Sequence, residues 1–220
     1  MIYQNKIKTL QRKANTLFTK KGAISNKLHF LKRKIRRNST FNLESEMEMC
    51  SLFPEKILEE ILLLFKPKSV LDLGCGKGAS LDFFLARGIA VKGIEGSTLA
   101  ISQARNPKLI FKYNLNKELN LNEKFDLVWS FEFIEHIHPK YVPNLINTFS
   151  NHSDTLILSA AHPGQWGVGH FNEQNDKYWI EKFKTANYYL NAEATARLRS
   201  LDEIFSQNMY VFERNKIWKQ

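Results

Sequence analysis

The stretch Val70-Leu71-Asp72-Leu73-Gly74-Cys75-Gly76-Lys77-Gly78, followed by Ile94-Glu95-Gly96, decides the fold of this 220-residue chain. Its pattern predicts a buried strand, a glycine turn, a helix, and a second strand that ends in a carboxylate. Glycines let the backbone pass close beneath a ligand, and a carboxylate about twenty residues further on can accept hydrogen bonds from two ribose hydroxyls. The sequence therefore predicts a nucleotide-cofactor site.

The spacing of the glycines narrows the kind of cofactor. Gly74, Gly76 and Gly78 follow a G-x-G-x-G pattern, whereas pyrophosphate binding at a helix N-terminus is typical of G-x-G-x-x-G. The carboxylate of Asp72 would repel a phosphate, and the chain contains no G-x-x-x-x-G-K-[ST] run of a P-loop. We therefore expect a cationic cofactor without phosphate.

Two stretches resemble a known family. The run D-x-G-x-G-x-G, with an acidic end to the second strand, resembles motifs I and II of class I S-adenosylmethionine-dependent methyltransferases. The stretch Phe125-Asp126-Leu127-Val128-Trp129-Ser130-Phe131-Glu132-Phe133-Ile134-Glu135-His136-Ile137 resembles motif IV of the methyltransferase-domain superfamily that acts on small molecules and glycans. The resemblance covers about residues 50 to 215 and implies S-adenosylmethionine as the cofactor.

The hydrophobic pattern alternates between strands and helices along the same region. It predicts strands over residues 69–73, 90–95, 108–113, 125–130 and 155–160. It also predicts one helix that begins at Pro54 and five further helices over residues 79–87, 97–105, 141–149, 176–186 and 192–207. Residues 188–190 and 209–213 are expected to form closing antiparallel strands. The sequence thus predicts an α/β fold with a doubly wound, seven-stranded, mostly parallel sheet, which is the Rossmann-like fold of the class I methyltransferases.

Charge divides the chain into two parts. Residues 1–43 carry twelve Lys or Arg and no Asp or Glu, while the rest carries twenty basic and twenty-two acidic residues, so the net charge of +10 comes from the arm. Apolar residues recur at helical spacing within it. We expect a basic amphipathic helical arm over residues 1–43 and a catalytic domain over residues 44–220. The arm can pack on protein, lie on an anionic membrane surface or follow RNA phosphates.

Several features concern the location of the protein. The longest apolar runs fall short of the roughly twenty residues that a membrane span needs, and the basic N-terminus lacks the pattern of a secretory signal. Cys50 and Cys75 cannot form a disulfide framework, and both are predicted to be free thiols. We expect a cytoplasmic protein, peripheral at the membrane surface if the arm binds anionic lipid.

The resemblance also implies the cofactor contacts. The carboxyl ends of parallel strands meet at one crevice, where Glu95 would hold the ribose hydroxyls and Asp72 the methionine ammonium. Asn114 stands where the family has an Asp that accepts from the adenine amino group. The full set of implied cofactor residues is Asp72, Gly74, Cys75, Gly76, Gly78, Glu95, Gly96, Ser97, Asn114, Leu115, Ser130, Phe131 and Glu132.

Two histidines are candidates for the catalytic base, because the pKa of histidine lies near neutrality. His136 follows motif IV, and His170 lies in a long loop that resembles the P-G-x-x-G-x-x-H-x-N segment of a subset of these enzymes. A cluster of Glu132, His136, His162 and His170 could hold a divalent metal, but its spacing matches no ligand signature. We expect no metal.

The expected activity is methyl transfer from S-adenosylmethionine to a hydroxyl, less readily an amine, of a small molecule or glycan. The absence of an N/D-P-P-[YF] tetrapeptide after residue 129 argues against methylation of nucleobase amines. The basic arm leaves RNA ribose or cap methylation as an alternative. A second alternative is a scaffold that binds the cofactor without catalysis.

Overall fold

The strand, glycine turn and helix predicted from residues 69–87 open the fold. The computed structural model describes residues 53–165, 167, 169–203 and 205–214, so the predicted arm and Cys50 lie outside the described residues. The helices and strands are α4 (Glu55–Phe65), β1 (Ser69–Leu73), α5 (Ala79–Leu85), β2 (Ala90–Glu95), α6 (Thr98–Ser102), β3 (Ile110–Lys112), β4 (Leu127–Ser130), α7 (Val142–His152), β5 (Thr155–Ser159), α8 (Asp176–Lys184), β6 (Tyr188–Leu190), α9 (Ala192–Arg199) and β7 (Met209–Arg214).

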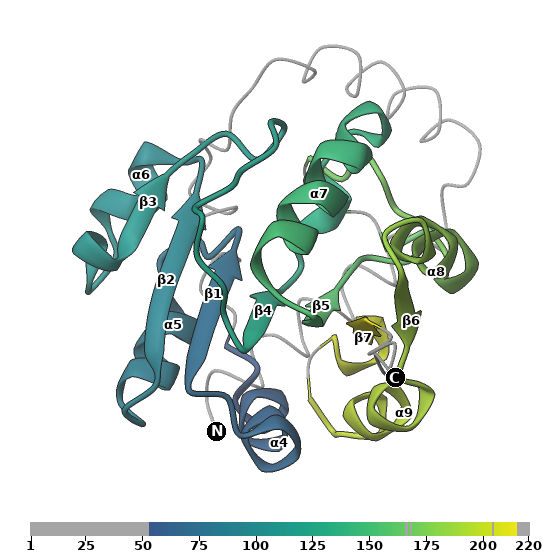
Figure 1. Cartoon of the computed structure of the whole chain (residues 1–220), viewed down its shortest axis with the longest axis horizontal. Helices are drawn as coiled ribbons and strands as arrows, with labels where there is room; N and C mark the ends of the chain where they lie inside the picture. Colours follow the sequence, from purple (N-terminus) through teal and green to yellow (C-terminus); the bar gives the residue numbers. More distant parts are fainter. Residues whose placement is uncertain (1–52, 166, 168, 204, 215–220) are drawn as a thin grey trace, which may run out of the picture. The chain divides into compact units, whose positions relative to one another are not determined.

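The strands form one seven-stranded sheet with the order β3-β2-β1-β4-β5-β7-β6 (Figure 1). The pairs from β3 to β5 are parallel, and β7 runs antiparallel to both β5 and β6. The predicted mostly parallel sheet with closing antiparallel strands is confirmed. Because β1, β2 and β4 point the same way, the segments that follow them meet at one edge of the sheet.

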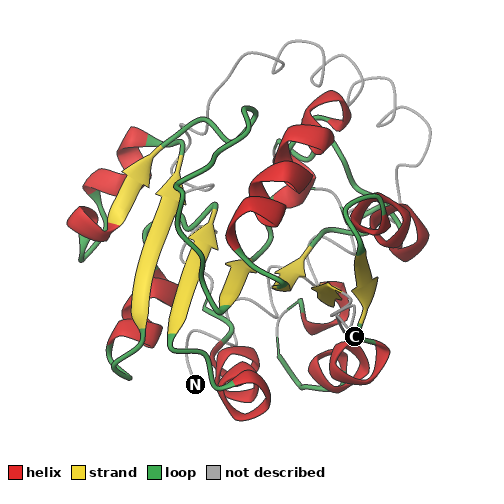
Figure 2. Cartoon of the chain, in the orientation of Figure 1, coloured by secondary structure: helices red, strands yellow, loops and turns green. Residues whose placement is uncertain are grey.

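Helices pack on both faces of the sheet (Figure 2). Along β4, Val128 faces the cluster that includes α7 and α8 residues, and Leu127 and Trp129 face the cluster that includes α4, α5 and α9 residues. This alternation follows from the two-residue period of a strand.

Several predicted boundaries were wrong; among the helices, the one predicted over residues 97–105 ends at Ser102, and the one predicted over residues 141–149 continues to His152. The strands predicted from Lys108 and Phe125 begin two residues later, at Ile110 and Leu127. Before β3 the chain forms a short 3-10 helix at Pro107–Leu109, because proline cannot donate to a strand ladder.

The last predicted helix, over residues 192–207, ends at Arg199. The segment beyond it is bonded to α4 instead, since Lys56 Nζ donates to the carbonyl of Asp202 at 3.0 Å and Lys56 N–H donates to Glu203 Oε2 at 3.2 Å. Phe205 then adopts a left-handed backbone with φ of 58°, which turns the chain toward β7.

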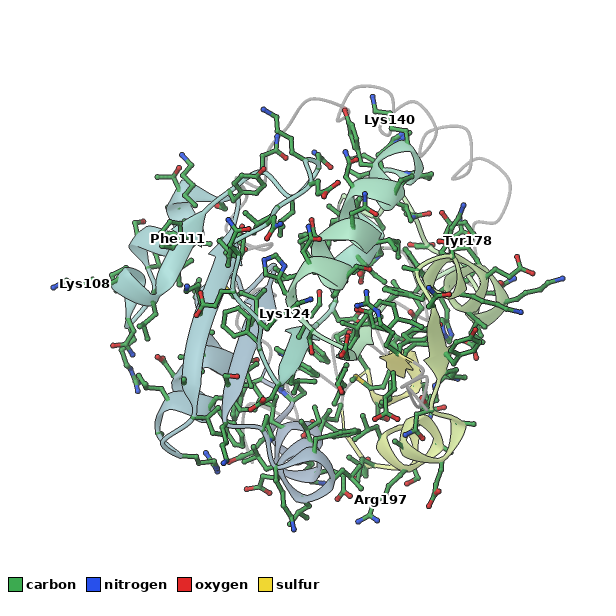
Figure 3. The ribbon with its side chains drawn as sticks, viewed as in Figure 1. Lys108, Phe111, Lys124, Lys140, Tyr178 and Arg197 are labelled. Carbon is green, nitrogen blue, oxygen red and sulfur yellow. The ribbon has the colours of Figure 1, made fainter. Side chains whose placement is uncertain are left out.

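The edge strand β3 carries one large apolar side chain on the surface. Phe111 is 60% exposed and lies with Lys108 at the outer side of the sheet (Figure 3). Within the described ranges, no helix is both long and apolar enough to cross a membrane.

Candidate active site

The glycine turn after β1 folds onto the end of β2. Gly74, Gly76 and Gly78 all have positive φ, at 76°, 55° and 80°, a region that glycine adopts without steric cost. The N–H groups of Gly74 and Cys75 both donate to the carbonyl of Ile94, at 2.9 and 3.2 Å. The turn therefore lies directly beside the acidic end of β2.

The carboxylate of Glu95 joins the turn to the start of α6. Its Oε2 accepts the N–H of Gly76 at 2.9 Å, and its Oε1 accepts the N–H of Ser97 at 2.7 Å. Ser97 also caps α6, as predicted, by accepting the N–H of Ala100 at 3.2 Å. The structure thus brings together Glu95, the glycine turn and Ser97, with Gly96 between them on an exposed backbone.

Asp72 is a buried carboxylate beneath the turn, only 3% exposed. Burial, and then the charge of Glu95, raise its pKa well above the usual range. Across the described part of the chain, no donor lies within hydrogen-bond distance of this carboxylate. A cationic group placed here would supply the missing partner, as an ammonium does.

Cys75 is a free thiol, as predicted. Burial, followed by the charges of Asp72 and Glu95, raises its pKa well above the usual range, so the sulfur stays protonated. Gly93 leaves space for it, because a Cβ at that position would lie 2.7 Å from Cys75 Sγ. Cys75 fills the loop and has no character of a nucleophile.

The aromatic ring of Phe133 covers the first glycine of the turn. A Cβ on Gly74 would lie 2.2 Å from the Phe133 ring, far inside van der Waals contact. Phe133 lies in the second motif, but its sequence position alone indicated no role for it. It connects the two halves of the site, because its neighbour Glu132 belongs to a separate cluster of ionisable groups.

The side chains of Ser130 and Phe131 contact other parts of the protein core. The Ser130 hydroxyl donates to the carbonyl of Leu73 at 2.9 Å and so ties β4 to β1. The Phe131 ring stacks on Trp129, with centroids 5.5 Å apart, and packs in the core on the α4 side of the sheet. The predicted contact of Phe131 with the cofactor would have to come from its backbone.

Asn114 and Leu115 follow β3. The Asn114 side chain is exposed, and its Oδ1 accepts the N–H of Asn116 at 3.0 Å to close a local turn. Leu115 is buried in the core on the α7 side. The predicted adenine contact of Asn114 stays a prediction, and it would require the amide to leave this turn.

A second cluster begins with Glu132, which follows β4 and has an unusual φ of 47°. Its N–H donates to Ser159 Oγ at 2.6 Å, and its Oε1 accepts Asn208 Nδ2 at 3.0 Å. Burial raises the pKa of Glu132 to about 7, against the opposing effect of the Asn208 and Ser159 bonds. A non-glycine residue in this conformation stores strain, which is typical of functional sites.

Glu135 is fully buried beside Glu132. Its Oε1 accepts the N–H of Ala161 at 3.3 Å, and its carbonyl accepts the N–H groups of Phe171 and Asn172, both at 2.9 Å. Burial, and then the charge of Glu132, raise its pKa well above the usual range. Its Oε2 is buried and has no hydrogen-bond partner among the described residues.

The two candidate catalytic histidines meet at this cluster. The rings of His136 and His170 cross edge to face, with centroids 4.9 Å apart. Burial, and then the nearby His170, lower the pKa of His136 to about 3, although a hydrogen bond to the backbone of Gly169 opposes the shift. His136, which was predicted as a base, is the last residue of the short 3-10 helix Ile134–His136.

Glu173, which the sequence analysis missed, orients His170. Its Oε1 lies 3.1 Å from His170 Nδ1, and its Oε2 accepts the N–H of Gly164 at 3.0 Å. Burial lowers the pKa of His170 and Glu173 opposes the shift. A Cβ on Gly167 would lie 2.1 Å from His170 Nε2, so only glycine at position 167 leaves room for the ring in this position.

His162 lies in the same loop but belongs to a different network. Its Nε2 is 3.0 Å from the hydroxyl of Tyr210 and 3.2 Å from Asp176 Oδ1. Arg199 holds the same carboxylate at 2.8 Å and 3.1 Å, and its hydrogen bond is the main cause of the lowered pKa of Asp176. His162 fixes the loop to α8 and β7.

Comparisons with known proteins agree with this geometry. Residues 41–201 match the model of a family described as methyltransferase domain. The chain is 33% identical over 109 residues to norajmaline N-methyltransferase of Rauvolfia serpentina, which covers 44% of this chain and 37% of that protein. It is 31% identical over 109 residues to a probable chloroplastic tocopherol O-methyltransferase of Oryza sativa subsp. japonica, which covers 44% of this chain and 30% of that protein. The matches thus span about a third of the length of these relatives.

A solved structure with the same fold is the O-methyltransferase of a trans-AT PKS multienzyme of Brevibacillus brevis, in complex with S-adenosyl-L-homocysteine. Its TM-score is 0.52 at 14% identity, with 73% of this chain and 72% of that chain covered.

Proposed function

The chain belongs to the methyltransferase-domain family and is a class I S-adenosylmethionine-dependent methyltransferase, and we propose that it methylates a hydroxyl oxygen of a small molecule or glycan. The observation that carries this proposal is the cluster of Glu135, His136 and His170, with Glu132 adjoining it, which follows Phe133, the residue whose ring packs on the glycine turn. A site with this arrangement offers a cofactor half and an acceptor half that adjoin each other.

The cofactor half fits S-adenosylmethionine. Asp72 lacks a donor from the described residues and suits the methionine ammonium, and the three glycines of the turn add no Cβ that would crowd a ligand. Glu95 accepts two backbone N–H groups and is placed to accept ribose hydroxyls at the same edge. These assignments are proposed for the residues named.

The acceptor half fits a hydroxyl. Methyl transfer from a sulfonium is an in-line displacement, and a hydroxyl acceptor has to lose its proton. With Nδ1–H donated to Glu173, His170 keeps Nε2 as the proton-accepting nitrogen. Because burial lowers its pKa, the ring stays neutral near pH 7, as a base must be.

The test is an assay of methyl transfer to matched hydroxyl and amine acceptors, in which the release of S-adenosylhomocysteine is measured. His170→Ala should lower kcat by about 10²- to 10⁴-fold with unchanged cofactor affinity. His162→Ala is the matched control in the same loop and should keep most of the activity, because His162 faces Tyr210 and Asp176. Turnover of amines alone, or equal losses in the two variants, would contradict the proposal.

A further inference from the structure

We propose that Glu135, His136 and His170 bind a divalent cation, with Glu132 beside them as a fourth ligand. This revises the expectation from the sequence that the site holds no metal. Its catalytic use rests on the proposed function, because the cation would lie where the acceptor hydroxyl is activated. The binding itself can be tested without any acceptor.

The first argument is distance. One ligand atom from each of Glu135, His136 and His170 can be chosen so that all three lie within 4.8 Å of one another. Three ligands at about 2.1 Å from one ion lie about 3.0 to 3.6 Å apart. Side-chain movements of about one ångström would therefore complete the coordination.

The second argument is the buried carboxylate. Glu135 is 0% exposed, and its Oε2 has no hydrogen-bond partner in the described part of the chain. When both groups are ionised, the carboxylate of Glu132 repels that of Glu135 in this buried position. A divalent cation between the two carboxylates would offset this repulsion and give Glu135 Oε2 a partner.

The third argument is the set of groups behind the ligands. Metal-binding histidines usually donate their second ring nitrogen to a carboxylate or a backbone carbonyl, and binding carboxylates are themselves hydrogen-bonded. His170 bonds Glu173, His136 bonds the backbone of Gly169, and Glu135 Oε1 accepts the N–H of Ala161. Each proposed ligand is therefore already oriented.

The donor set indicates the kind of cation. Carboxylates suit Mg²⁺ and Mn²⁺, whereas imidazoles suit Zn²⁺, Fe²⁺ and neighbouring first-row ions. Two of each favour a first-row divalent ion such as Mn²⁺, Co²⁺ or Zn²⁺. A hydroxyl bound to such an ion loses its proton more readily, so the ion would take over the activation assigned above to the His170 ring.

The metal cluster considered from the sequence contained His162 and not Glu135. In the structure, His162 Nε2 bonds Tyr210 and Asp176. This difference supplies a matched pair of histidine variants from one loop.

The experiment is calorimetric titration of chelator-treated full-length protein with Mn²⁺, Co²⁺ and Zn²⁺. Wild type should bind one equivalent of at least one ion. Glu135→Gln and His170→Asn should weaken binding by at least about tenfold, and Glu173→Gln by about 10- to 100-fold. His162→Asn should bind like wild type. Thermal melting and S-adenosylhomocysteine binding on the same samples show that the variants are folded.

Absence of saturable binding to wild type would overturn the proposal, and so would unchanged binding in folded Glu135→Gln and His170→Asn. The proposed function has a separate readout. Wild type that binds the ion but methylates no hydroxyl would contradict the proposed function and leave the cation site standing.

Discussion

The two halves of the proposed site are built in different ways. In the cofactor half, Glu95 bonds residues 19 and 2 positions away along the chain. In the acceptor half, Glu132 bonds Ser159 and Asn208, 27 and 76 positions away. The cofactor half is specified by local spacing, whereas the acceptor half exists only once the sheet has brought three segments together.

Each half nevertheless depends on a glycine packed against a ring. Gly74 lies beneath Phe133, and Gly167 lies against His170. Because a Cβ would collide with the ring in either place, single alanine substitutions can separate the functions of the two halves.

Gly74→Ala should have the largest effect. The new Cβ would lie 2.2 Å from the Phe133 ring, at a φ of +76° that already disfavours alanine. We expect a stability loss of about 2 to 4 kcal/mol from strain and overpacking together, with loss of S-adenosylhomocysteine binding, measured by denaturation and calorimetry.

Gly88→Ala is the control, since its φ is +75° but nothing lies within 4 Å of its Cβ. It should lose only about 1 kcal/mol. Adding Phe133→Ala should restore part of the stability of Gly74→Ala. Equal losses in the two single variants would show that the ring contact is unimportant.

Gly167→Ala should affect the acceptor half alone. Its Cβ would lie 2.1 Å from His170 Nε2 and displace the ring, while its backbone has no positive φ to penalise alanine. We expect a kcat lower by about 10²-fold or more, with cofactor affinity within error of wild type. A parallel fall in cofactor affinity, measured by calorimetry, would mean that the halves are not separable in this way.

His152 lies outside both halves of the proposed site and provides a comparison for the lowered pKa values of His136 and His170. It is fully buried; its Nε2 accepts the N–H of Leu121, and its Nδ1 contacts the carbonyl of Thr148. Burial lowers the pKa of His152 in the native state. Below about pH 6.5, this histidine is therefore protonated in the unfolded chain but stays neutral in the native protein.

Stability should therefore fall as the pH drops below about 6.5, by at most about 1.4 kcal/mol per pH unit for this one group. His152→Gln should have a shallower dependence in urea denaturation between pH 5 and 8. An identical slope in wild type and variant would contradict the assignment. A lowered histidine pKa thus also arises at a residue such as His152, whose two ring nitrogens both bond the backbone, and is not by itself a sign of a catalytic histidine.

Deletion of residues 1–40 should have the smallest effect. The proposed small-molecule or glycan enzyme keeps its fold and activity without the basic arm, as circular dichroism and turnover would show. Loss of turnover, with a wild-type activity on RNA that falls steeply with salt, would favour the RNA alternative instead.

Much of the fold could be predicted from the sequence, and so could the glycine turn and the cap that lie in the proposed cofactor half. The bounds of β1 and β2 and the cap at Ser97 are as predicted, because apolar runs, glycine turns and capping residues act locally. The family match agrees with the motifs. The roles of Asn114 and of the catalytic histidines, and the arm itself, stay predictions.

The rest depends on contacts that spacing does not encode. Phe133 meets Gly74 only through the pairing of β1 with β4, and Asn208 reaches Glu132 only because β7 inserts beside β5. His170 and His162 look equivalent in sequence, and only the fold separates them. Glu173 and the fully buried Glu135 gained their importance from burial, which a loop sequence does not reveal.

The most direct test of the central claim is calorimetric binding of S-adenosylhomocysteine to wild type, Glu95→Ala and Glu123→Ala. Glu123 pairs with Lys92 of the same strand β2 and serves as the matched surface carboxylate. We predict binding on the order of micromolar for wild type and Glu123→Ala, weakened by about 1 to 3 kcal/mol in Glu95→Ala. Absence of binding to wild type, or undiminished affinity in Glu95→Ala, would contradict the proposed cofactor site.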